Sequence, residues 1–279
     1  MGQISELIQQ GAKQLENSDS AHLDAQLLLA HTLGVDRVWV MTWGDKDLEA
    51  QQESDFLRLI ERRKSGEPIA YILGRREFWG RDFFCNEHTL IPRPDTERLV
   101  ELALGLKLPD MAKVLDLGTG TGCIALTLAA EKPDWEVVAT DYSLEAIAVA
   151  EKNRSALGLE NARFLQSDWY QSLPSDAEFD LIVANPPYID PASPYLLEGD
   201  VRFEPDLALT SEKQGISALE ALISSAPTYL KQDGWLAVEH GFDQGTLVQG
   251  LFNELGFQQI QLAKDLAGLD RCSYGCLYL

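Results

Sequence analysis

A tetrapeptide in the second half of the chain carries the clearest chemical pattern. It reads Asn185-Pro186-Pro187-Tyr188 and follows an apolar run at residues 181–184. Two adjacent prolines fix the backbone and have no N–H to donate, so the peptide presents its carbonyl groups as acceptors. The side chain of Asn185 adds another acceptor, and Tyr188 offers a flat ring. Such a peptide is suited to hold a planar NH₂ group by both of its hydrogens.

This arrangement fits chemistry on a poor nucleophile. An amide nitrogen attacks slowly because it shares its lone pair with the neighbouring carbonyl group. Acceptors on both N–H groups raise the electron density on that nitrogen, and rigid placement aligns it with an electrophile. If the electrophile is a methyl group, no strong base is needed, because the nitrogen is very acidic once it has accepted the methyl. The same four residues also suit an ordinary proline turn, so the interpretation depends on what accompanies them.

A glycine-rich loop lies earlier in the chain, between a predicted strand and a predicted helix. The loop reads Asp116-Leu117-Gly118-Thr119-Gly120-Thr121-Gly122. Glycines let the backbone turn sharply and approach a ligand closely, although a turn alone also uses them. Asp141 ends the next predicted strand, where a carboxylate can accept hydrogen bonds from a ribose. The two features together predict a nucleoside site.

The spacing of the glycines restricts the class of ligand that the loop can bind. It is G-x-G-x-G, whereas dinucleotide-binding folds have G-x-G-x-x-G and hold a pyrophosphate at a helix N-terminus. Asp116, just before the loop, suits a cationic ligand without phosphates, so S-adenosylmethionine fits and NAD fits poorly. After the third predicted strand, we expect Asp168 to bond the adenine amine and Trp169 to pack on its ring. Taken singly, Trp169 is more typical of a core residue than of a ligand contact.

These motifs lie at the ends of strands in an expected α/β domain. Strand and helix patterns alternate after Pro94, with helices at 123–131 and 144–157, which indicates a mostly parallel Rossmann-like sheet covered on both faces. Ligands of such sheets bind at the carboxyl ends of the strands. We expect the last two strands to form an antiparallel edge pair. The predicted strands are Lys113–Leu117, Glu136–Thr140, Arg163–Gln166, Leu181–Ala184, Trp235–Glu239, Gln258–Leu262 and Ser273–Leu279.

The chain divides into three predicted parts. Residues 1–74 have helical periodicity and no catalytic constellation, with Asp19 or Ser20 as a cap for the second helix. Residues 75–94 form a predicted β-hairpin connector, and residues 95–279 form the α/β domain. The apolar pairs of the connector are Phe78-Trp79, Phe83-Phe84 and Leu90-Ile91.

Composition restricts the partners. The chain has 23 Lys and Arg against 44 Asp and Glu, a net charge of −21. Such a surface repels phosphate backbones, so we expect no direct nucleic acid binding, although acidity also simply maintains solubility. No long apolar stretch or basic leader is visible, which predicts a cytoplasmic protein without a membrane association. Cys272 and Cys276 lack further ligands for zinc, so we expect buried free thiols and no metal.

The combined motifs resemble a known family. Asn-Pro-Pro-Tyr behind an Asp-x-Gly-x-Gly-x-Gly loop is similar to amino-group methyltransferases that modify adenine, cytosine or glutamine. Three further segments narrow the resemblance to the release factor glutamine methyltransferases (the HemK family), and it covers essentially the whole chain. These segments are Arg76-Glu77-Phe78-Trp79, Glu87-His88-Thr89-Leu90-Ile91-Pro92-Arg93-Pro94-Asp95-Thr96-Glu97 and Lys264-Asp265-Leu266-Ala267-Gly268-Leu269-Asp270-Arg271.

The resemblance implies methylation of the glutamine amide in the Gly-Gly-Gln loop of peptide chain release factors. It implies that the helical domain grips the release factor and that Asn185, Pro186 and Tyr188 are catalytic. It assigns the glutamine to Asn185, Pro186, Pro187 and Tyr188. It assigns S-adenosylmethionine to Gly118, Thr119, Gly120, Thr121, Gly122, Asp141, Trp169 and Asn185.

Two other functions remain open from the sequence. A DNA adenine N6-methyltransferase uses the same tetrapeptide on an extruded base, but it needs a basic surface or a target-recognition domain. The charge of −21 and the lack of an inserted domain argue against it. A non-catalytic cofactor-binding assembly factor is the second alternative, and it would have no use for an intact Asn185–Tyr188.

Overall fold

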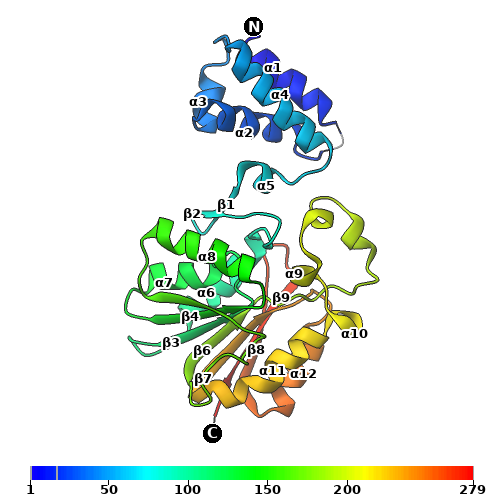
Figure 1. Ribbon diagram of the computed structural model, residues 1–279. Coiled ribbons are helices and arrows are strands. Elements are labelled where there is room, and N and C mark those ends of the chain that lie inside the picture. The colour runs from blue at the N-terminus through cyan, green and yellow to red at the C-terminus, as the bar shows by residue number, and fades with distance from the viewer. Residues whose placement is uncertain (1, 17, 279) are drawn as a thin grey trace. The chain divides into compact units, whose positions relative to one another are not determined.

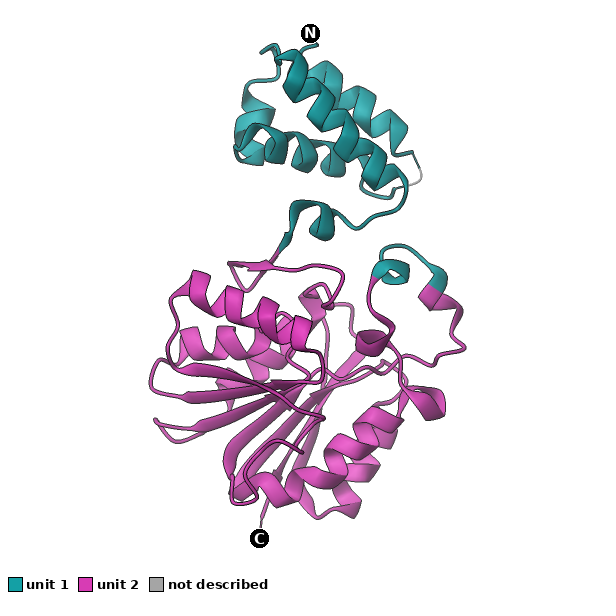
Figure 2. Ribbon diagram, viewed as in Figure 1, with its two compact units in different colours: residues 1–75, 197–203 teal, residues 76–196, 204–279 magenta. Residues whose placement is uncertain are grey.

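The computed structural model describes residues 2–16 and 18–278, and the chain forms two compact units. Unit 1 comprises Met1–Arg75 together with Leu197–Phe203, whereas unit 2 comprises Arg76–Leu196 and Glu204–Leu279 (Figure 2). The chain therefore leaves unit 2 after the tetrapeptide, contributes a short segment to unit 1 and returns to unit 2.

Unit 1 is helical (Figure 1). Apolar residues recur at helical spacing along the first helix, so one face of it is buried, including Ile4 and Leu7. On the same face, a Cβ at Gly11 would lie 2.9 Å from side-chain atoms of Phe56 and Ile60, so glycine permits close packing of two helices. The helices are α1 (Ile4–Gln14), α2 (Ala21–Leu33), α3 (Arg37–Thr42), α4 (Ala50–Lys64) and α5 (Ile69–Leu73).

The start of α2 differs from the prediction. Ser20 precedes the helix, but its side chain caps no backbone N–H; its hydroxyl donates instead to Asp24 Oδ1 at 2.8 Å. Asp24 is 3% exposed and also accepts from the Ser18 hydroxyl at 2.9 Å. The buried carboxylate therefore uses the hydroxyl group that the capping prediction assigned to the helix end. The short helices α3 and α5 were not predicted.

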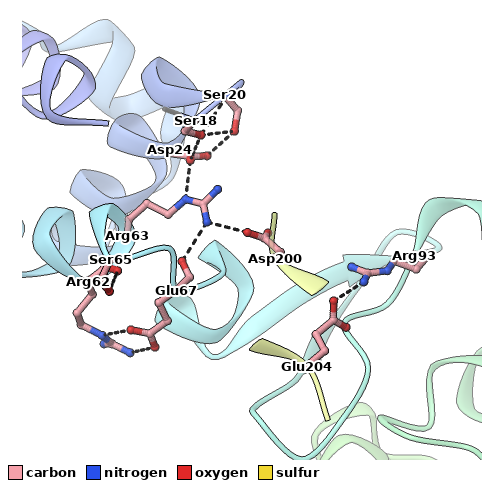
Figure 3. A network of polar contacts seen from close by, with 10 residues as sticks. All are labelled: Ser18, Ser20, Asp24, Arg62, Arg63, Ser65, Glu67, Arg93, Asp200 and Glu204. Atoms are coloured by element: carbon pink, nitrogen blue, oxygen red, sulfur yellow. Dashed lines mark hydrogen bonds and ion pairs between the residues drawn. The ribbon is translucent and has the colours of Figure 1, made fainter. Parts of the chain in front are cut away.

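Arg63 of α4 connects the helices of unit 1 to its detached segment (Figure 3). Its Nε donates to Asp24 Oδ2 and its Nη1 to Asp200 Oδ1, both at 2.8 Å. Nη1 also donates to the Glu67 carbonyl group at 3.0 Å. Because Arg63 and Asp24 are largely buried, removing one would leave the other charge unpaired in a low-dielectric environment.

Unit 2 contains a hairpin and a seven-stranded sheet. The hairpin pairs β1 (Arg75–Phe78) with β2 (Arg81–Phe84), as predicted, but Leu90 and Ile91 are not in a strand. The large sheet has the order β5-β4-β3-β6-β7-β9-β8. Its strands are β3 (Lys113–Leu117), β4 (Glu136–Asp141), β5 (Ala162–Gln166), β6 (Phe179–Ala184), β7 (Leu230–Glu239), β8 (Phe257–Lys264) and β9 (Asp270–Leu277).

Helices cover both faces of this sheet (Figure 1). Alternate residues of β3 belong to different cores: Val114 packs with α6 to α8, and Leu115 packs with α11 and α12. All six residues of β6 are buried, as expected for a strand covered on both faces. The helices of unit 2 are α6 (Glu97–Gly105), α7 (Cys123–Glu131), α8 (Leu144–Leu157), α9 (Asp206–Leu209), α10 (Glu212–Gly215), α11 (Ser217–Tyr229) and α12 (Gly245–Glu254).

The topology confirms the predicted fold class. Strands β3 to β7 are parallel, and β9 pairs antiparallel with both β7 and β8, so the last two strands form the expected antiparallel pair. The cysteines of β9 are free and buried, like Cys85 and Cys123. Among the described residues, no helix has the length and apolar character that crossing a bilayer requires.

Candidate active site

The carboxyl ends of β3 to β6 border a cavity of about 370 Å³. Strand β3 lies between β4 and β6, so the order of the sheet reverses at this point, where open α/β sheets bind ligands. Of the predicted site residues, all of them described, the cavity wall includes Gly118, Thr119, Gly120, Thr121, Asp141, Trp169, Asn185 and Pro187, but not Gly122, Pro186 or Tyr188.

The glycine loop is held mainly by backbone hydrogen bonds. The N–H groups of Gly118 and Thr119 both donate to the Thr140 carbonyl group at 2.9 Å. Gly122 adopts a φ of 80°, and a Cβ there would lie 3.1–3.2 Å from side chains of the surrounding core. The third glycine therefore allows α7 to pack closely against its neighbours and is not in the cavity wall.

Asp116 lies beneath the loop and does not line the cavity, contrary to the expectation that it faces a cationic ligand. It is fully buried, and its Oδ2 accepts from the Thr119 hydroxyl at 2.6 Å. Burial raises the pKa of Asp116 to about 7, against the hydrogen bonds from Thr119 and the Ala125 N–H. Asp116 thus stabilises the loop from within.

Asp141 ends β4 and faces the cavity. Its Oδ2 accepts from the Gly120 N–H at 2.8 Å, and its Oδ1 accepts from the Ser143 N–H at 2.9 Å. Burial raises the pKa of Asp141, and these donors act in the opposite direction. Each carboxylate oxygen has a second lone pair, so Asp141 can also accept hydrogen bonds from the hydroxyl groups of a ribose.

Trp169 follows β5, at a position compatible with both roles considered from the sequence. Its side chain lines the cavity and also packs against the core beside α11 and α12. The indole lies 3.6 Å from where a Cβ of Gly118 would stand, so it rests directly over the loop. Asp168 lines the cavity too, and its Oδ2 accepts from Gln171 at 2.9 Å.

The tetrapeptide begins where β6 ends. Asn185 Nδ2 donates to the Thr96 hydroxyl at 3.0 Å, so the side-chain amide is oriented by a residue from the segment before α6. Its Oδ1 is then the atom available to a ligand, and Asn185 and Pro187 both line the cavity. The geometry therefore offers an acceptor at the place where the sequence predicts an NH₂ group.

Tyr188 turns away from this cavity. Its hydroxyl donates to Glu239 Oε1 at 3.1 Å, and its ring packs against the core. Its carbonyl group accepts from Gln244 Nε2 at 3.1 Å. Burial beside Glu239 raises the pKa of Tyr188, so the phenol remains protonated at neutral pH. The predicted stacking of Tyr188 on a substrate amide stays a prediction.

Comparison with known proteins identifies the family. Residues 6–74 match the PrmC N-terminal domain, and residues 99–195 match the methyltransferase small domain. The chain is 47% identical to the release factor glutamine methyltransferase of Shewanella oneidensis, over 98% of this chain and 95% of that protein. It is also 47% identical to the release factor glutamine methyltransferase of Pseudomonas aeruginosa, over 94% of this chain and 95% of that protein. The chain belongs to the release factor glutamine methyltransferases.

Solved structures confirm the fold of this family member. A methyltransferase from Pyrococcus furiosus matches with a TM-score of 0.55 at 19% identity, over 81% of this chain and all of that one. A Thermus thermophilus 16S rRNA N2 G1207 methyltransferase, in complex with AdoMet and guanosine, matches with a TM-score of 0.52 at 22% identity. The match covers 73% of this chain and 49% of that one. At these identities the likeness concerns the methyltransferase fold alone.

Several residues of the cavity wall were not named as site residues from the sequence. Most residues of segment 88–93 line the cavity, as do Pro205 and, in α9, Leu207 and Ala208. Glu204 anchors the chain just before α9, because its buried carboxylate accepts from the Ile91 N–H at 2.9 Å and from the Arg93 guanidinium (Figure 3). The resemblance at 87–97 pointed to one side of this contact, whereas no local pattern marks Glu204.

Proposed function

We propose that this protein transfers a methyl group from S-adenosylmethionine to the side-chain amide nitrogen of the glutamine in the Gly-Gly-Gln motif of peptide chain release factors. The observation that carries the proposal is the orientation of Asn185 by Thr96 in the cavity that the glycine loop and Asp141 also line. Amide recognition and cofactor recognition would thus meet in one place.

The residues of the cavity wall fit the cofactor. Asp141 would accept the ribose hydroxyl groups, the glycine loop would approach the amino acid tail, and Trp169 would pack on the adenine. When bound, S-adenosylmethionine supplies an electrophilic methyl group as a sulfonium. The wall residues hold no phosphate-binding motif of the dinucleotide type, in agreement with a phosphate-free nucleoside.

Asn185 would act on the glutamine amide. Its Oδ1 and a carbonyl group of the proline pair would accept the two amide hydrogens, which raises the electron density on nitrogen and aligns its lone pair. Methyl transfer leaves a positively charged amide nitrogen, which is very acidic and gives one proton to water, so no strong base is needed. Rigid acceptors are therefore sufficient for this reaction.

Tandem mass spectrometry tests the proposal. The full chain is incubated with cofactor and, in separate reactions, with a release factor, a DNA duplex and a ribosomal protein. We expect one added methyl on the Gly-Gly-Gln glutamine, and none with Asn185→Ala. Methylated adenine in DNA without modified release factor would instead support the DNA methyltransferase alternative, and no product with any substrate would support the assembly factor.

We further propose that unit 1 docks the release factor, in the cytoplasm. A single glutamine side chain offers little contact area, so a second surface must provide affinity. Val38 and Met41 lie three residues apart on α3 and are 68% and 59% exposed, so their side chains are neighbours that a partner could cover. Val38→Ser with Met41→Ser should raise KM for the intact release factor and leave KM for a Gly-Gly-Gln peptide unchanged. If the double variant and the wild-type chain had the same KM for the intact release factor, docking through α3 would be contradicted.

A further inference from the structure

Glu204 is a buried acid in the connection between β6 and α9. Its Oε2 accepts from the Ile91 N–H at 2.9 Å, and its Oε1 accepts from the guanidinium of Arg93 (Figure 3). These partners lie 113 and 111 residues earlier in the chain. Both oxygens of the carboxylate therefore hold one short segment that is distant in the sequence.

The contact joins two stretches of the cavity wall. The residues on either side of Ile91 line the cavity, and so does Arg93. Pro205, which directly follows Glu204 in the chain, lines it as well. The carboxylate of Glu204 therefore fixes these two stretches of the wall to each other.

Segment 91–96 has little conformational freedom. Pro92 and Pro94 fix the φ angles at two of its positions, and each proline also restricts the residue before it. The Thr96 N–H donates to the Arg93 carbonyl group at 3.1 Å, which closes a turn at the end of the segment. When one end of so stiff a segment is held, the other end is placed as well.

Thr96, at the far end of this segment, contacts the tetrapeptide. It is 3% exposed, and its hydroxyl accepts from Asn185 Nδ2 at 3.0 Å. That contact leaves Oδ1 of Asn185 available to a ligand, as the proposed amide recognition requires. A continuous series of hydrogen bonds and stiff backbone thus runs from Glu204 to Asn185.

The stability of the fold does not by itself account for the ion pair between Glu204 and Arg93. Taking a carboxylate out of water costs about as much free energy as its attraction to a guanidinium returns, so a buried pair contributes little net stability. Losing one partner nevertheless leaves an uncompensated charge, which disfavours every arrangement in which the two are apart. The ion pair is therefore better explained by the segment that it holds in place.

We propose that Glu204 is a positioning residue, which holds segment 91–96 so that Thr96 keeps Asn185 oriented toward the amide being methylated. The inference rests on the proposed function, because it concerns the same reaction. Glu204 does not line the cavity, so it acts through the segment that it holds. The glycine loop, by contrast, is held by the end of β4. Loss of Glu204 should therefore lower turnover and leave cofactor affinity nearly unchanged.

The test compares Glu204→Gln with the wild-type chain in steady-state kinetics on release factor, and by calorimetry with S-adenosylmethionine. Glutamine has nearly the same volume, but its NH₂ group must face one of the two donors, Ile91 or Arg93. We expect kcat to fall about 3- to 10-fold, the effect of one lost hydrogen bond. The cofactor Kd should stay within about twofold, well below the tenfold that 1.4 kcal/mol represents.

A double variant separates positioning from a general loss of structure. Thr96→Val removes the acceptor for Asn185, so in that background Glu204→Gln has nothing left to position. We expect the double variant to have a kcat close to that of the less active single variant, whereas independent effects would multiply. Multiplied losses would overturn the inference. So would wild-type kcat in Glu204→Gln, or a loss of cofactor affinity equal to the loss of kcat.

Asp180→Asn is the matched control. Asp180 is also a buried carboxylate that accepts from one backbone N–H and one cation, here the Lys113 N–H and Lys231 Nζ, both at 2.7 Å. It lies near the other end of β6, away from the tetrapeptide. Its substitution should lower the melting temperature and leave kcat unchanged. A kcat loss equal to that of Glu204→Gln would overturn the inference, because any lost buried ion pair would then have the same effect.

Hydrogen–deuterium exchange makes the test independent of turnover. In Glu204→Gln, peptides that cover residues 89–97 should exchange faster than in the wild-type chain, and in Asp180→Asn they should not. Unchanged exchange in these peptides of Glu204→Gln would overturn the inference. If the exchange difference appears but the wild-type chain leaves the release factor unmodified, the anchoring by Glu204 stands and the proposed function fails.

Pro94→Gly keeps the test decisive if Glu204→Gln does not fold. Pro94 is exposed, so this substitution loosens segment 91–96 without removing a buried contact. We expect kcat to fall about 2- to 5-fold because of the added backbone freedom, with the cofactor Kd unchanged. Wild-type kcat in Pro94→Gly would show that the stiffness of the segment does not matter and would overturn the inference.

Discussion

Asp116 and Glu239 are two fully buried carboxyl groups that lie under different halves of the candidate site. Burial raises the pKa of each to about 7, and each has one oxygen without a partner among the described residues. Asp116 bonds Thr119, three positions further along the same loop. Glu239 bonds Tyr188, which follows a different strand. The proposed cofactor half is thus built locally, whereas the proposed amide half is assembled from distant segments.

Because of this difference, we expect that substitutions can affect one half of the candidate site without affecting the other. The local half depends on one strand, one loop and the acid that ends the neighbouring strand. The assembled half requires that β6, β7 and the segment before α6 meet in register. Substitutions in the first should therefore change cofactor affinity, and substitutions in the second should change turnover.

Asn185→Ala should have the largest effect. Removing the oriented Oδ1 acceptor should lower kcat about 100- to 1,000-fold, or about 2.7–4 kcal/mol, by analogy with the loss of one oxyanion-hole donor. The cofactor Kd should change much less. Steady-state kinetics at saturating release factor, with calorimetry alongside, measures both. Near-normal turnover in this variant would remove Asn185 from its proposed role.

Asp141→Ala tests the cofactor half. The lost hydrogen bonds to a charged acceptor should weaken S-adenosylmethionine by about 1.5–3 kcal/mol. At saturating cofactor, kcat should be nearly normal. Calorimetry that shows unchanged affinity would contradict the ribose assignment, and a dominant fall in kcat would contradict the separation of the two halves.

The raised pKa values predict a pH dependence of stability. Asp116 has a usual pKa of 3.8 and Glu239 of 4.5, and both are raised to about 7 in the folded chain. Between about pH 4 and pH 7 the folded state therefore binds more protons than the unfolded state. The free energy of unfolding falls as the pH rises through this range. Asp116→Asn and Glu239→Gln remove this loss. The difference in unfolding free energy between each variant and the wild-type chain should therefore increase by about 1–3 kcal/mol from pH 5 to pH 8. This is the penalty for a poorly paired buried group.

Urea unfolding of the three proteins at both pH values measures this gain. The comparison between variant and wild type cancels the contribution of other titrating groups. An equal difference in unfolding free energy at pH 5 and pH 8 would show that the two carboxyl groups do not titrate in this range.

The smallest expected effects come from Thr96→Val and Thr119→Val, which remove one hydroxyl from each half at nearly constant volume. Each hydrogen bond should contribute about 0.5–1.5 kcal/mol. Thr96→Val should appear as a loss of kcat, and Thr119→Val as a weaker cofactor Kd. If both variants changed the same parameter, the two halves would not be independent.

The local half of the candidate site was also the half whose positions short-range patterns predicted. Strand β3 matched its prediction, the glycine loop follows it directly, and Asp141 ends β4. Glu239 was missed because its partner Tyr188 lies on another element, although it ends a buried strand as Asp141 does. Leu90 and Ile91 were predicted only as an apolar part of the connector, and the contact of the Ile91 N–H with Glu204, 113 residues later, could not be predicted from the local sequence.

The ion pair between Arg63 and Asp200 has a consequence for recombination of this chain. Unit 1 is discontinuous, because the segment Leu197–Phe203 belongs to it. A single crossover after residue 75 would transplant the helices without Asp200 and leave Arg63 with a foreign loop. A chimera that tests whether unit 1 determines release factor preference should therefore graft both pieces together. The unit is a two-part cassette, and its second part is encoded shortly after the tetrapeptide.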